Sequence, residues 1–189
     1  MDGLKVTSLK IPEVKLIEPK VFGDDRGFFM ESFHTERYRE AGINEAFVQD
    51  NVSYSSQGVL RGLHYQYPQG QGKLIYVLQG SVYDVAVDVR HGSPTFGQWV
   101  AAVLTNQNHY QLYVPPGFAH GFCVLSEKAL FSYKCTEFYH PETECSILWD
   151  DPSINIEWPI RSPKLSPKDD KALRLADVAK EKLPPYRPA

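Results

Sequence analysis

The sequence predicts an all-β protein, arranged as an antiparallel sandwich or barrel. Its 189 residues include 11 Tyr, 10 Phe and 3 Trp beside 14 Pro and 13 Gly, and this composition favours many short strands joined by turns. Turn signals recur about every ten residues, a spacing typical of sandwiches and barrels. The length is that of one ordinary domain with a buried core, so we expect residues 1–189 to form a single domain.

The N-terminal third is expected to combine strands with one short helix. A helix is predicted at residues 35–41, where Thr35 can cap the first turn and Gly42 can end the last. Strands are predicted at residues 11–22, 28–33 and 47–54. The last of these has a polar middle, Gln49-Asp50-Asn51, which is costly inside a strand unless the side chains face a ligand or solvent.

Residues 59–66 (VLRGLHYQ) are the most informative strand. Apolar residues alternate with an arginine, a histidine and an amide, which predicts a polar face that carries Arg61, His64 and Gln66 into a concave interior. The alternation slips by one residue around Gly62, which predicts a bulge there. Taken alone, the segment fits a structural His64 bonded to the backbone as well as a His64 that faces a ligand.

The middle of the chain is expected to continue the β structure. Residues 73–90 predict a hairpin that turns at Gln79-Gly80. On its second arm, Val85 and Val87 share one face with other apolar residues, whereas Asp84 and Asp88 point to the opposite face. Further strands are predicted at residues 96–104, 110–114, 120–125, 130–138 and 147–149.

The C-terminal segment differs from the rest, because it predicts a helix and tail from about residue 165. Ser166 fits the N-cap, Pro167 fits the first helical position, and Asp169 is the third residue after the cap, as in a capping box. Capping alone is a sufficient structural explanation for Asp169, so the pattern by itself assigns this residue no catalytic role.

Charge and cysteine content limit the partners and the compartment. A net charge of −3 gives no electrostatic reason to expect nucleic acid or an anionic membrane as a partner. Cys123, Cys135 and Cys145 lack Cys-x-x-Cys spacing and are expected to be free thiols in a reducing cytosol. No apolar run reaches the ~18 residues of a transmembrane helix, and no signal peptide is evident. We therefore expect a soluble, cytoplasmic protein.

Residues 115–122 (PPGFAHGF) have the P-x-G-x-x-H shape of a motif found in cupins, small β-barrels that often hold a metal ion. Cupins also have a first motif that supplies metal ligands. In this chain, Gln66 occupies the position of the second histidine of that motif, and Lys73 occurs where a glutamate ligand is expected. A lysine beside histidines argues against a metal site. We therefore expect no bound metal, which leaves the histidines free for proton chemistry.

Three cations and one tyrosine have two interpretations each. Arg26, Arg61 and Lys73 are either surface charges or ligands for a diphosphate, whose oxygens suit the forked donors of arginine. Tyr133 is either a core aromatic or a phenolic acid in a pocket with Lys73, where a nearby cation would lower the phenol pKa.

Longer motifs carry a family resemblance. Residues 18–29 (EPKVFGDDRGFF) and the later runs FVQDN, VLRGLHYQ, QGKL, DVAVDVR, SPTFGQW, PPGFAHGF and SILWDDPSINIEWP closely resemble the dTDP-4-dehydrorhamnose 3,5-epimerase family. The resemblance covers residues from about 11 to 170. It implies a cupin-type jelly-roll β-barrel with a few short helices, and a homodimer that shares N-terminal strands across its interface. It also implies a dTDP-linked 4-keto-6-deoxy sugar as substrate, a place in dTDP-L-rhamnose biosynthesis, and no metal or redox cofactor.

The resemblance further implies a mechanism. The C4 ketone of the substrate acidifies the protons at C3 and C5, so a base and an acid can invert each centre through an enolate. By similarity, His64 is the base, Asp169 supports it, Tyr133 donates the proton and Lys73 stabilises the enolate oxygen. Asp84 is implied as an ion-pair partner of Lys73. Substrate contacts are implied for Arg26, Glu31, Gln49, Asp50, Asn51, Arg61, His120, Tyr139 (stacked on thymine), Glu144 and Lys168.

Three alternatives remain open at this point. A cupin-like binding module would hold a nucleotide sugar without turnover, although it would not need a base, an acid and a lysine together. A mono-epimerase would act at C3 or C5 only on another nucleotide-linked 4-keto sugar, and the same three groups do not distinguish it from a double epimerase. Asp170 is the alternative partner of His64.

Overall fold

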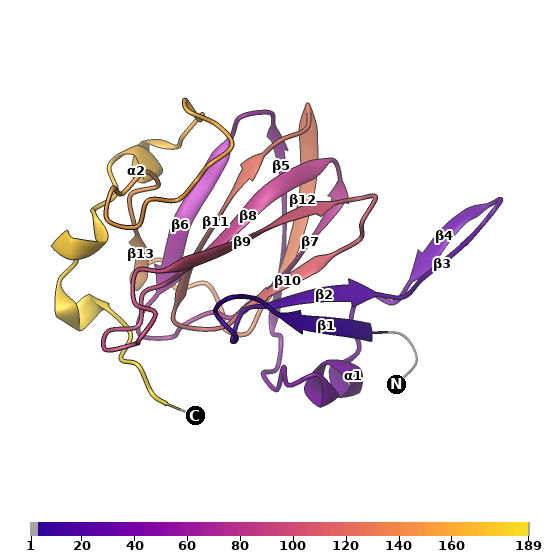
Figure 1. The fold of residues 1–189 in the computed structure, drawn as a ribbon, viewed down its shortest axis with the longest axis horizontal. Coiled ribbons are helices and arrows are strands. Elements are labelled where there is room, and N and C mark those ends of the chain that lie inside the picture. Colours follow the sequence, from indigo (N-terminus) through magenta and orange to yellow (C-terminus); the bar gives the residue numbers. More distant parts are fainter. Residues whose placement is uncertain (1–3, 189) are drawn as a thin grey trace.

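The computed structural model describes residues 4–188, which form two β-sheets packed face to face (Figure 1). The strands are β1 (Leu4–Ser8), β2 (Lys15–Pro19), β3 (Val21–Asp24), β4 (Gly27–Met30), β5 (Gln49–Ser56), β6 (Leu60–Gln66), β7 (Lys73–Gln79), β8 (Ser81–Asp88), β9 (Trp99–Thr105), β10 (Gln111–Val114), β11 (Phe118–Val124), β12 (Lys128–Cys135) and β13 (Glu144–Ser146). The helical segments are α1 (Thr35–Glu40), α2 (Pro167–Asp170) and the 3₁₀ turns η1 (Leu175–Asp177) and η2 (Lys180–Lys182).

The strand order confirms the predicted all-β jelly roll with few short helices. The larger sheet has the order β1-β2-β10-β7-β12-β5, and the smaller sheet has the order β13-β6-β11-β8-β9. Neighbouring strands pair antiparallel throughout. Within residues 4–188 no strand is shared by the two sheets, so they form an open sandwich and not a closed barrel. β3 and β4 pair only with each other and project from the sandwich (Figure 1).

Apolar side chains fill the space between the sheets and also pack against their outer faces. Ile75 and Phe131 of the larger sheet belong to the same buried cluster as Ala86 of the smaller sheet. A second cluster lies on the outer face of the smaller sheet, where Val85 packs with Leu175 of the C-terminal segment. The alternation predicted for β8 is therefore confirmed, because Val85 and Ala86 belong to different clusters on opposite faces.

Residues 73–90 do not form the predicted hairpin. β7 pairs with β10 and β12 in the larger sheet, whereas β8 pairs with β9 and β11 in the smaller sheet. The chain crosses between the sheets at Gly80, whose N–H donates to Asn106 Oδ1 at 2.9 Å. Both strands are largely buried on both faces, so a local turn signal could not reveal that each pairs with strands distant in sequence.

β6 contains the predicted bulge. His120 of β11 pairs with His64, but Phe122 pairs with Arg61, so β6 has one extra residue between these pairs. Gly62 lies in the bulge with a φ of +127°. The extra residue leaves Leu63 in the outer apolar cluster and turns Arg61 and His64 toward the interior.

The C-terminal helix is much shorter than predicted. Ser166 is its N-cap as expected, and the Ser166 Oγ accepts a hydrogen bond from the Asp169 N–H at 3.1 Å. α2 stops at Asp170 because the following backbone bonds elsewhere. Leu173 O accepts from Leu148 N–H at 2.8 Å, and Leu175 N–H donates to Asp151 Oδ2 at 2.7 Å. These bonds use groups that a longer helix would need.

Smaller differences occur elsewhere. β1 is not among the predicted strands, and residues 147–149 contribute only an isolated bridge from Ile147 to Leu173. The N-cap of α1 is His34, without a side-chain capping bond, so Thr35 is the first helical residue and not the cap. None of the helices among residues 4–188 has the length and apolar character needed to cross a membrane.

Gly62→Ala is expected to lower the free energy of unfolding by more than about 3 kcal/mol. A Cβ at this position would lie 2.5 Å from Gly121 Cα, and the backbone φ is one that side chains rarely adopt. Gly92→Ala is the matched control, because Gly92 has a φ of +86° but nothing within 4 Å of its added Cβ. We expect the control to cost about 1–2 kcal/mol, as measured by urea denaturation. Equal losses in the two variants would contradict a tight contact between β6 and β11.

Candidate active site

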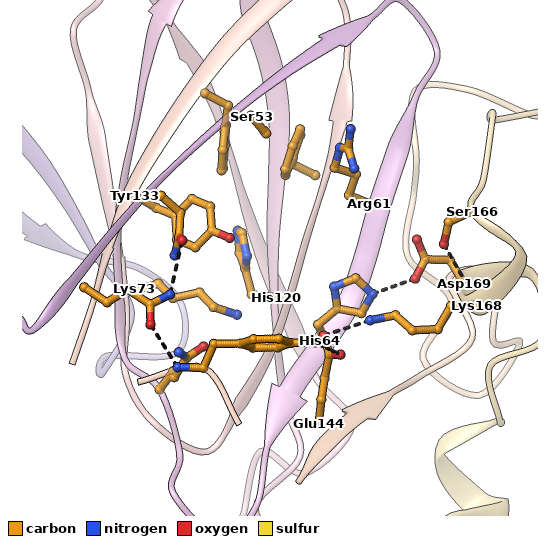
Figure 2. Close-up of a pocket in the computed structure, with 16 residues that line it drawn as sticks. Ser53, Arg61, His64, Lys73, His120, Tyr133, Glu144, Ser166, Lys168 and Asp169 are labelled. Atoms are coloured by element: carbon orange, nitrogen blue, oxygen red, sulfur yellow. Dashed lines mark hydrogen bonds and ion pairs between the residues drawn. The ribbon is translucent and has the colours of Figure 1, made fainter. Parts of the chain in front are cut away.

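A cavity of about 420 Å³ opens between the two sheets. Its walls come from β5, β7 and β12 of the larger sheet, β6, β11 and β13 of the smaller sheet, and the segment around α2 (Figure 2). Most of the predicted site residues line it: Gln49, Asn51, Arg61, His64, Lys73, His120, Tyr133, Tyr139, Glu144, Lys168 and Asp169.

His64 and Asp169 form a hydrogen-bonded pair in the cavity wall, with His64 Nε2 2.5 Å from Asp169 Oδ1. Burial of Asp169 would by itself raise the pKa of its carboxyl. The hydrogen bond and charge of His64, the Ser166 hydroxyl and Lys168 outweigh burial, so the pKa of Asp169 lies below its usual value. Asp170 is exposed, which leaves Asp169 as the carboxylate paired with His64.

This pair has the arrangement that a general base needs. An ionised Asp169 assigns the proton of a neutral His64 ring to Nε2. The other ring nitrogen, Nδ1, points away from Asp169 and toward the cavity in Figure 2. An unprotonated nitrogen supported in this way can accept a proton from a bound molecule.

Tyr133 faces the cavity from β12, in the sheet opposite His64. Burial raises the pKa of its phenol to about 12, and the charge of Arg61 offsets only part of this effect. The expected lowering of this pKa by a nearby cation is therefore wrong, because burial is the largest effect and the pKa is raised. The phenol keeps its proton at neutral pH and can act as a proton donor.

Lys73, Asp84 and His120 form a buried polar group beside the cavity. Asp84 Oδ1 lies 2.9 Å from His120 Nε2, so the bonded partner of Asp84 is His120 and not Lys73 as predicted. Burial lowers the pKa of Lys73 and raises that of Asp84, although the charge of each residue opposes the shift of the other. A lysine in such low-dielectric surroundings stabilises a nearby negative oxygen more strongly than it would in water.

Glu144 joins two other cavity residues. Its Oε1 lies 2.8 Å from Lys168 Nζ, and its Oε2 accepts a hydrogen bond from the Tyr139 hydroxyl at 2.9 Å. Gln49 Oε1 accepts from the Tyr139 N–H at 2.9 Å and so fixes the loop that carries this tyrosine. Tyr139 is 52% exposed, which leaves part of its ring available for stacking.

Three predicted site residues do not line the cavity of their own chain. Asp50 alternates with Gln49 and Asn51 along β5, so its side chain points to the other face, where it pairs with Lys134 at 2.9 Å. Arg26 lies in the turn between β3 and β4 and pairs with Asp24. Glu31 pairs with Arg37 of α1 at 2.6 Å.

The cavity also contains residues that the sequence analysis does not assign to the site: Ser53, Gln71, Phe122, Phe131 and Ser166. Strand periodicity could have found Ser53, because it continues the alternation of Gln49 and Asn51. In the sequence pattern, Phe122 and Phe131 are indistinguishable from ordinary core residues. Both do belong to the buried cluster between the sheets.

Gln66 does not line the cavity, and its amide bonds to the backbone of neighbouring loops. Its Nε2 donates to Gln69 O at 2.9 Å and Phe138 O at 3.1 Å, and its Oε1 accepts from His140 N–H at 3.0 Å. Within residues 4–188, no three His, Cys, Asp or Glu side chains are grouped closely enough to hold a metal ion.

Comparison with known proteins gives consistent matches. The family model described as dTDP-4-dehydrorhamnose 3,5-epimerase matches residues 8–177. The protein of that name from Pseudomonas aeruginosa is 56% identical over 177 residues, which cover 93% of this chain and 98% of the relative. The one from Neisseria gonorrhoeae is 55% identical over 88% of this chain, which spans only 51% of that relative's length.

A solved structure matches almost completely. It is a crystal structure of dTDP-6-deoxy-D-glucose-3,5-epimerase from Legionella pneumophila in complex with dTDP-4-keto-L-rhamnose. Its TM-score with this chain is 0.96 at 55% sequence identity, and the match covers 98% of this chain and 100% of that chain.

Asp169→Asn is expected to weaken the dependence of stability on acid pH. Because the pKa of Asp169 is lowered in the folded state, its stabilisation is complete above the unfolded value of about 3.9 and is lost as pH falls through the folded value. Urea denaturation should therefore separate variant and wild type more at about pH 6 than at about pH 3. The exposed neighbour provides the control Asp170→Asn, which should follow wild type at both pH values. A difference that is independent of pH would contradict this account of Asp169.

Proposed function

The chain belongs to the dTDP-4-dehydrorhamnose 3,5-epimerase family, and we propose a mechanism by which its cavity performs the isomerisation. The reaction converts dTDP-4-dehydro-6-deoxy-D-glucose to dTDP-4-dehydro-L-rhamnose, in dTDP-L-rhamnose biosynthesis. It inverts C3 and C5, on either side of the C4 ketone, by removing a proton from one face and returning one to the other. Each inversion is redox-neutral, so this scheme involves no redox cofactor.

The observation that carries the mechanism is that His64 and Tyr133, the proposed base and acid, face one cavity from opposite sheets. His64 and Asp169 face the cavity from β6 and α2, and Tyr133 faces it from β12. The lowered pKa of Asp169 favours a carboxylate behind His64, whereas burial keeps the Tyr133 phenol protonated. A sugar ring bound between the sheets would meet the base on one face and the acid on the other.

The proposed steps conserve protons and electrons. His64 Nδ1 takes the proton from C3 or C5, and the electron pair of that C–H bond moves through the ketone to leave an enolate oxygen at C4. Lys73 stabilises this oxygen. Tyr133 then gives its proton to the same carbon from the opposite face. Exchange with solvent returns His64 to its neutral form and Tyr133 to its phenol form, ready for the second centre.

Seven other cavity residues would bind the sugar nucleotide. Arg61 and Lys168 supply positive charge for the phosphates or the sugar. Tyr139 would stack on thymine, since its ring is partly exposed at the cavity. Four further residues are polar partners for the ligand: Gln49, Asn51, His120 and Glu144. Asp50 is left out of this set because its carboxylate faces the other side of β5.

We also propose a homodimer in which Arg26 and Glu31 act at the cavity of the partner subunit. The β3–β4 hairpin projects from the sandwich (Figure 1), and its Phe28 and Phe29 are 61% and 70% exposed. Val52 and Tyr54 on the outer face of the larger sheet are also exposed. Such apolar surface is unfavourable in water, and a second copy of the chain would cover it.

A cytoplasmic location is part of the proposal. Cys123, Cys135 and Cys145 are free thiols, which suits a reducing compartment.

The direct test of the function follows hydrogen exchange in heavy water. Purified protein is incubated with dTDP-4-dehydro-6-deoxy-D-glucose, and NMR and mass spectrometry locate the deuterium. We expect label at both C3 and C5, with a product that a rhamnose-forming reductase accepts. Label at one carbon would indicate a mono-epimerase, and no label with intact nucleotide binding would contradict turnover of this sugar.

His64→Ala tests the base within the same assay. The variant should lose at least about a hundredfold in turnover while largely keeping its affinity for dTDP, because proton transfer is deleted and phosphate contacts remain. His91→Ala, which changes a histidine outside the cavity lining, is the control and should behave as wild type. Activity of His64→Ala within a few-fold of wild type would assign the base to another residue.

Mixing two weakened variants tests the shared site. Arg26→Ala and His64→Ala are each expected to lose most activity as homodimers. In a mixed dimer, one cavity combines an intact His64 with an intact Arg26 from the other subunit. Random reassociation of equal amounts should therefore restore about a quarter of wild-type activity. If the mixture only averages its two parents, Arg26 does not act across the interface.

A further inference from the structure

We propose that Ser53 is a substrate-binding residue, whose hydroxyl bonds to a sugar or phosphate oxygen of the bound sugar nucleotide. This assignment rests on the proposed function, because that function supplies the ligand. Ser53 lies on β5 and lines the cavity. None of the roles described above uses its hydroxyl.

The inner face of β5 carries polar side chains at every second residue: Gln49, Asn51, Ser53 and Ser55. Gln49 Nε2 donates to Asn51 Oδ1 at 3.1 Å, and Asn51 Nδ2 lies 3.5 Å from Cys135 Sγ. Ser55 Oγ accepts from Arg61 Nε at 3.1 Å. The Ser53 hydroxyl is the exception, since it is buried without a hydrogen-bond partner within residues 4–188.

The protein side of this position is apolar. Ser53 pairs across strands with Phe131, whose ring stacks on Phe122 at a centroid distance of 3.9 Å. Both phenylalanines line the cavity. A hydroxyl that reaches neither water nor a protein acceptor is unfavourable. The cavity that Ser53 lines offers a direction from which a ligand can supply the partner.

The other unpaired buried atoms in the described part of the chain do not share this setting. They belong to His34, Asp84 and Tyr113, and none of these residues lines the cavity. Asp84, moreover, bonds to His120 through its other oxygen. Among residues 4–188, Ser53 alone combines an unpaired hydroxyl with a position in the cavity wall.

The position along β5 limits which part of the ligand Ser53 can meet. Gln49 bonds to the loop of Tyr139, the proposed thymine contact. Ser53 is four residues further along, which corresponds to about 13 Å in a β-strand. In Figure 2, Ser53 and Arg61 lie on the side of the cavity away from Glu144. The partner is therefore an oxygen of the sugar or of the diphosphate, and not of the base.

Ser53→Ala tests the assignment with three measurements. We expect kcat/KM for the 4-keto sugar nucleotide to fall roughly tenfold, as for loss of one hydrogen bond. Calorimetry with dTDP and with dTDP-glucose, used as a non-reacting probe, then separates the two sources of the oxygen. A contact with the diphosphate weakens binding of both probes, whereas a contact with the sugar weakens dTDP-glucose binding only. Either pattern supports the assignment.

Ser56→Ala is the matched control, because Ser56 is an exposed serine on the opposite face of the same strand. It should match wild type in all three measurements. Thermal unfolding of Ser53→Ala should occur at or above the wild-type temperature, since the change removes an unpaired hydroxyl. The assignment is overturned if Ser53→Ala stays within twofold of wild type throughout, or if its losses follow a lower unfolding temperature.

The results expected if the proposed function is wrong differ from those that would overturn the role of Ser53. Wild type would then leave the keto sugar unlabelled in heavy water, while dTDP-glucose binding could still depend on Ser53. Turnover by wild type with an unaffected Ser53→Ala would overturn only the role of Ser53.

Discussion

The hydrogen bond between His64 and Asp169 joins two parts of the chain that are 105 residues apart, and the geometry of the proposed base depends on it. Asp169 lies in the first turn of a four-residue helix that could not hold its position alone. The segment after it is fixed by Asp151, which accepts the Leu175 N–H, and by burial of Leu175 and Leu183 on the smaller sheet. Apolar packing on the outer face of this sheet thus helps to position the Asp169 carboxylate, which lines the cavity on the inner face.

The interior of the sandwich serves two purposes that conflict energetically. Apolar residues such as Ile75 and Ala86 stabilise the contact between the sheets, whereas Lys73, Asp84 and His120 are polar groups buried in the same interior. Burial penalises each charged form, and the pKa values of all three residues shift in that direction. The same low-dielectric surroundings would strengthen the proposed interaction of Lys73 with a developing enolate. The proposed role of Lys73 therefore depends on a burial that costs stability.

Local patterns in the sequence predicted features that depend on neighbouring residues. The alternation along β8, the bulge at Gly62 and the Ser166 cap are all confirmed. Features set by distant contacts escaped prediction. Turn chemistry at Gly80 does not reveal that β7 and β8 join different sheets, and the Ser166 cap does not reveal that Asp151 stops the helix. The direction in which the Tyr133 pKa shifts depends on whether burial or nearby charge has the larger effect, and residue types alone do not determine this. The family resemblance predicted which residues line the cavity far better than any local sequence pattern did.

One base and one acid are sufficient for two inversions because of the geometry of the sugar. In the chair form of a 6-deoxy-D-glucose ring with equatorial substituents, the hydrogens at C3 and C5 are both axial and lie on the same face. In the proposed mechanism, a single His64 on β6 can therefore reach either hydrogen after a small shift of the ring, while Tyr133 on β12 faces the same carbons from the other side. The C4 oxygen between these carbons would stay near Lys73 in both steps. A cavity between two sheets suits this chemistry, since each sheet contributes one partner of the proton transfer.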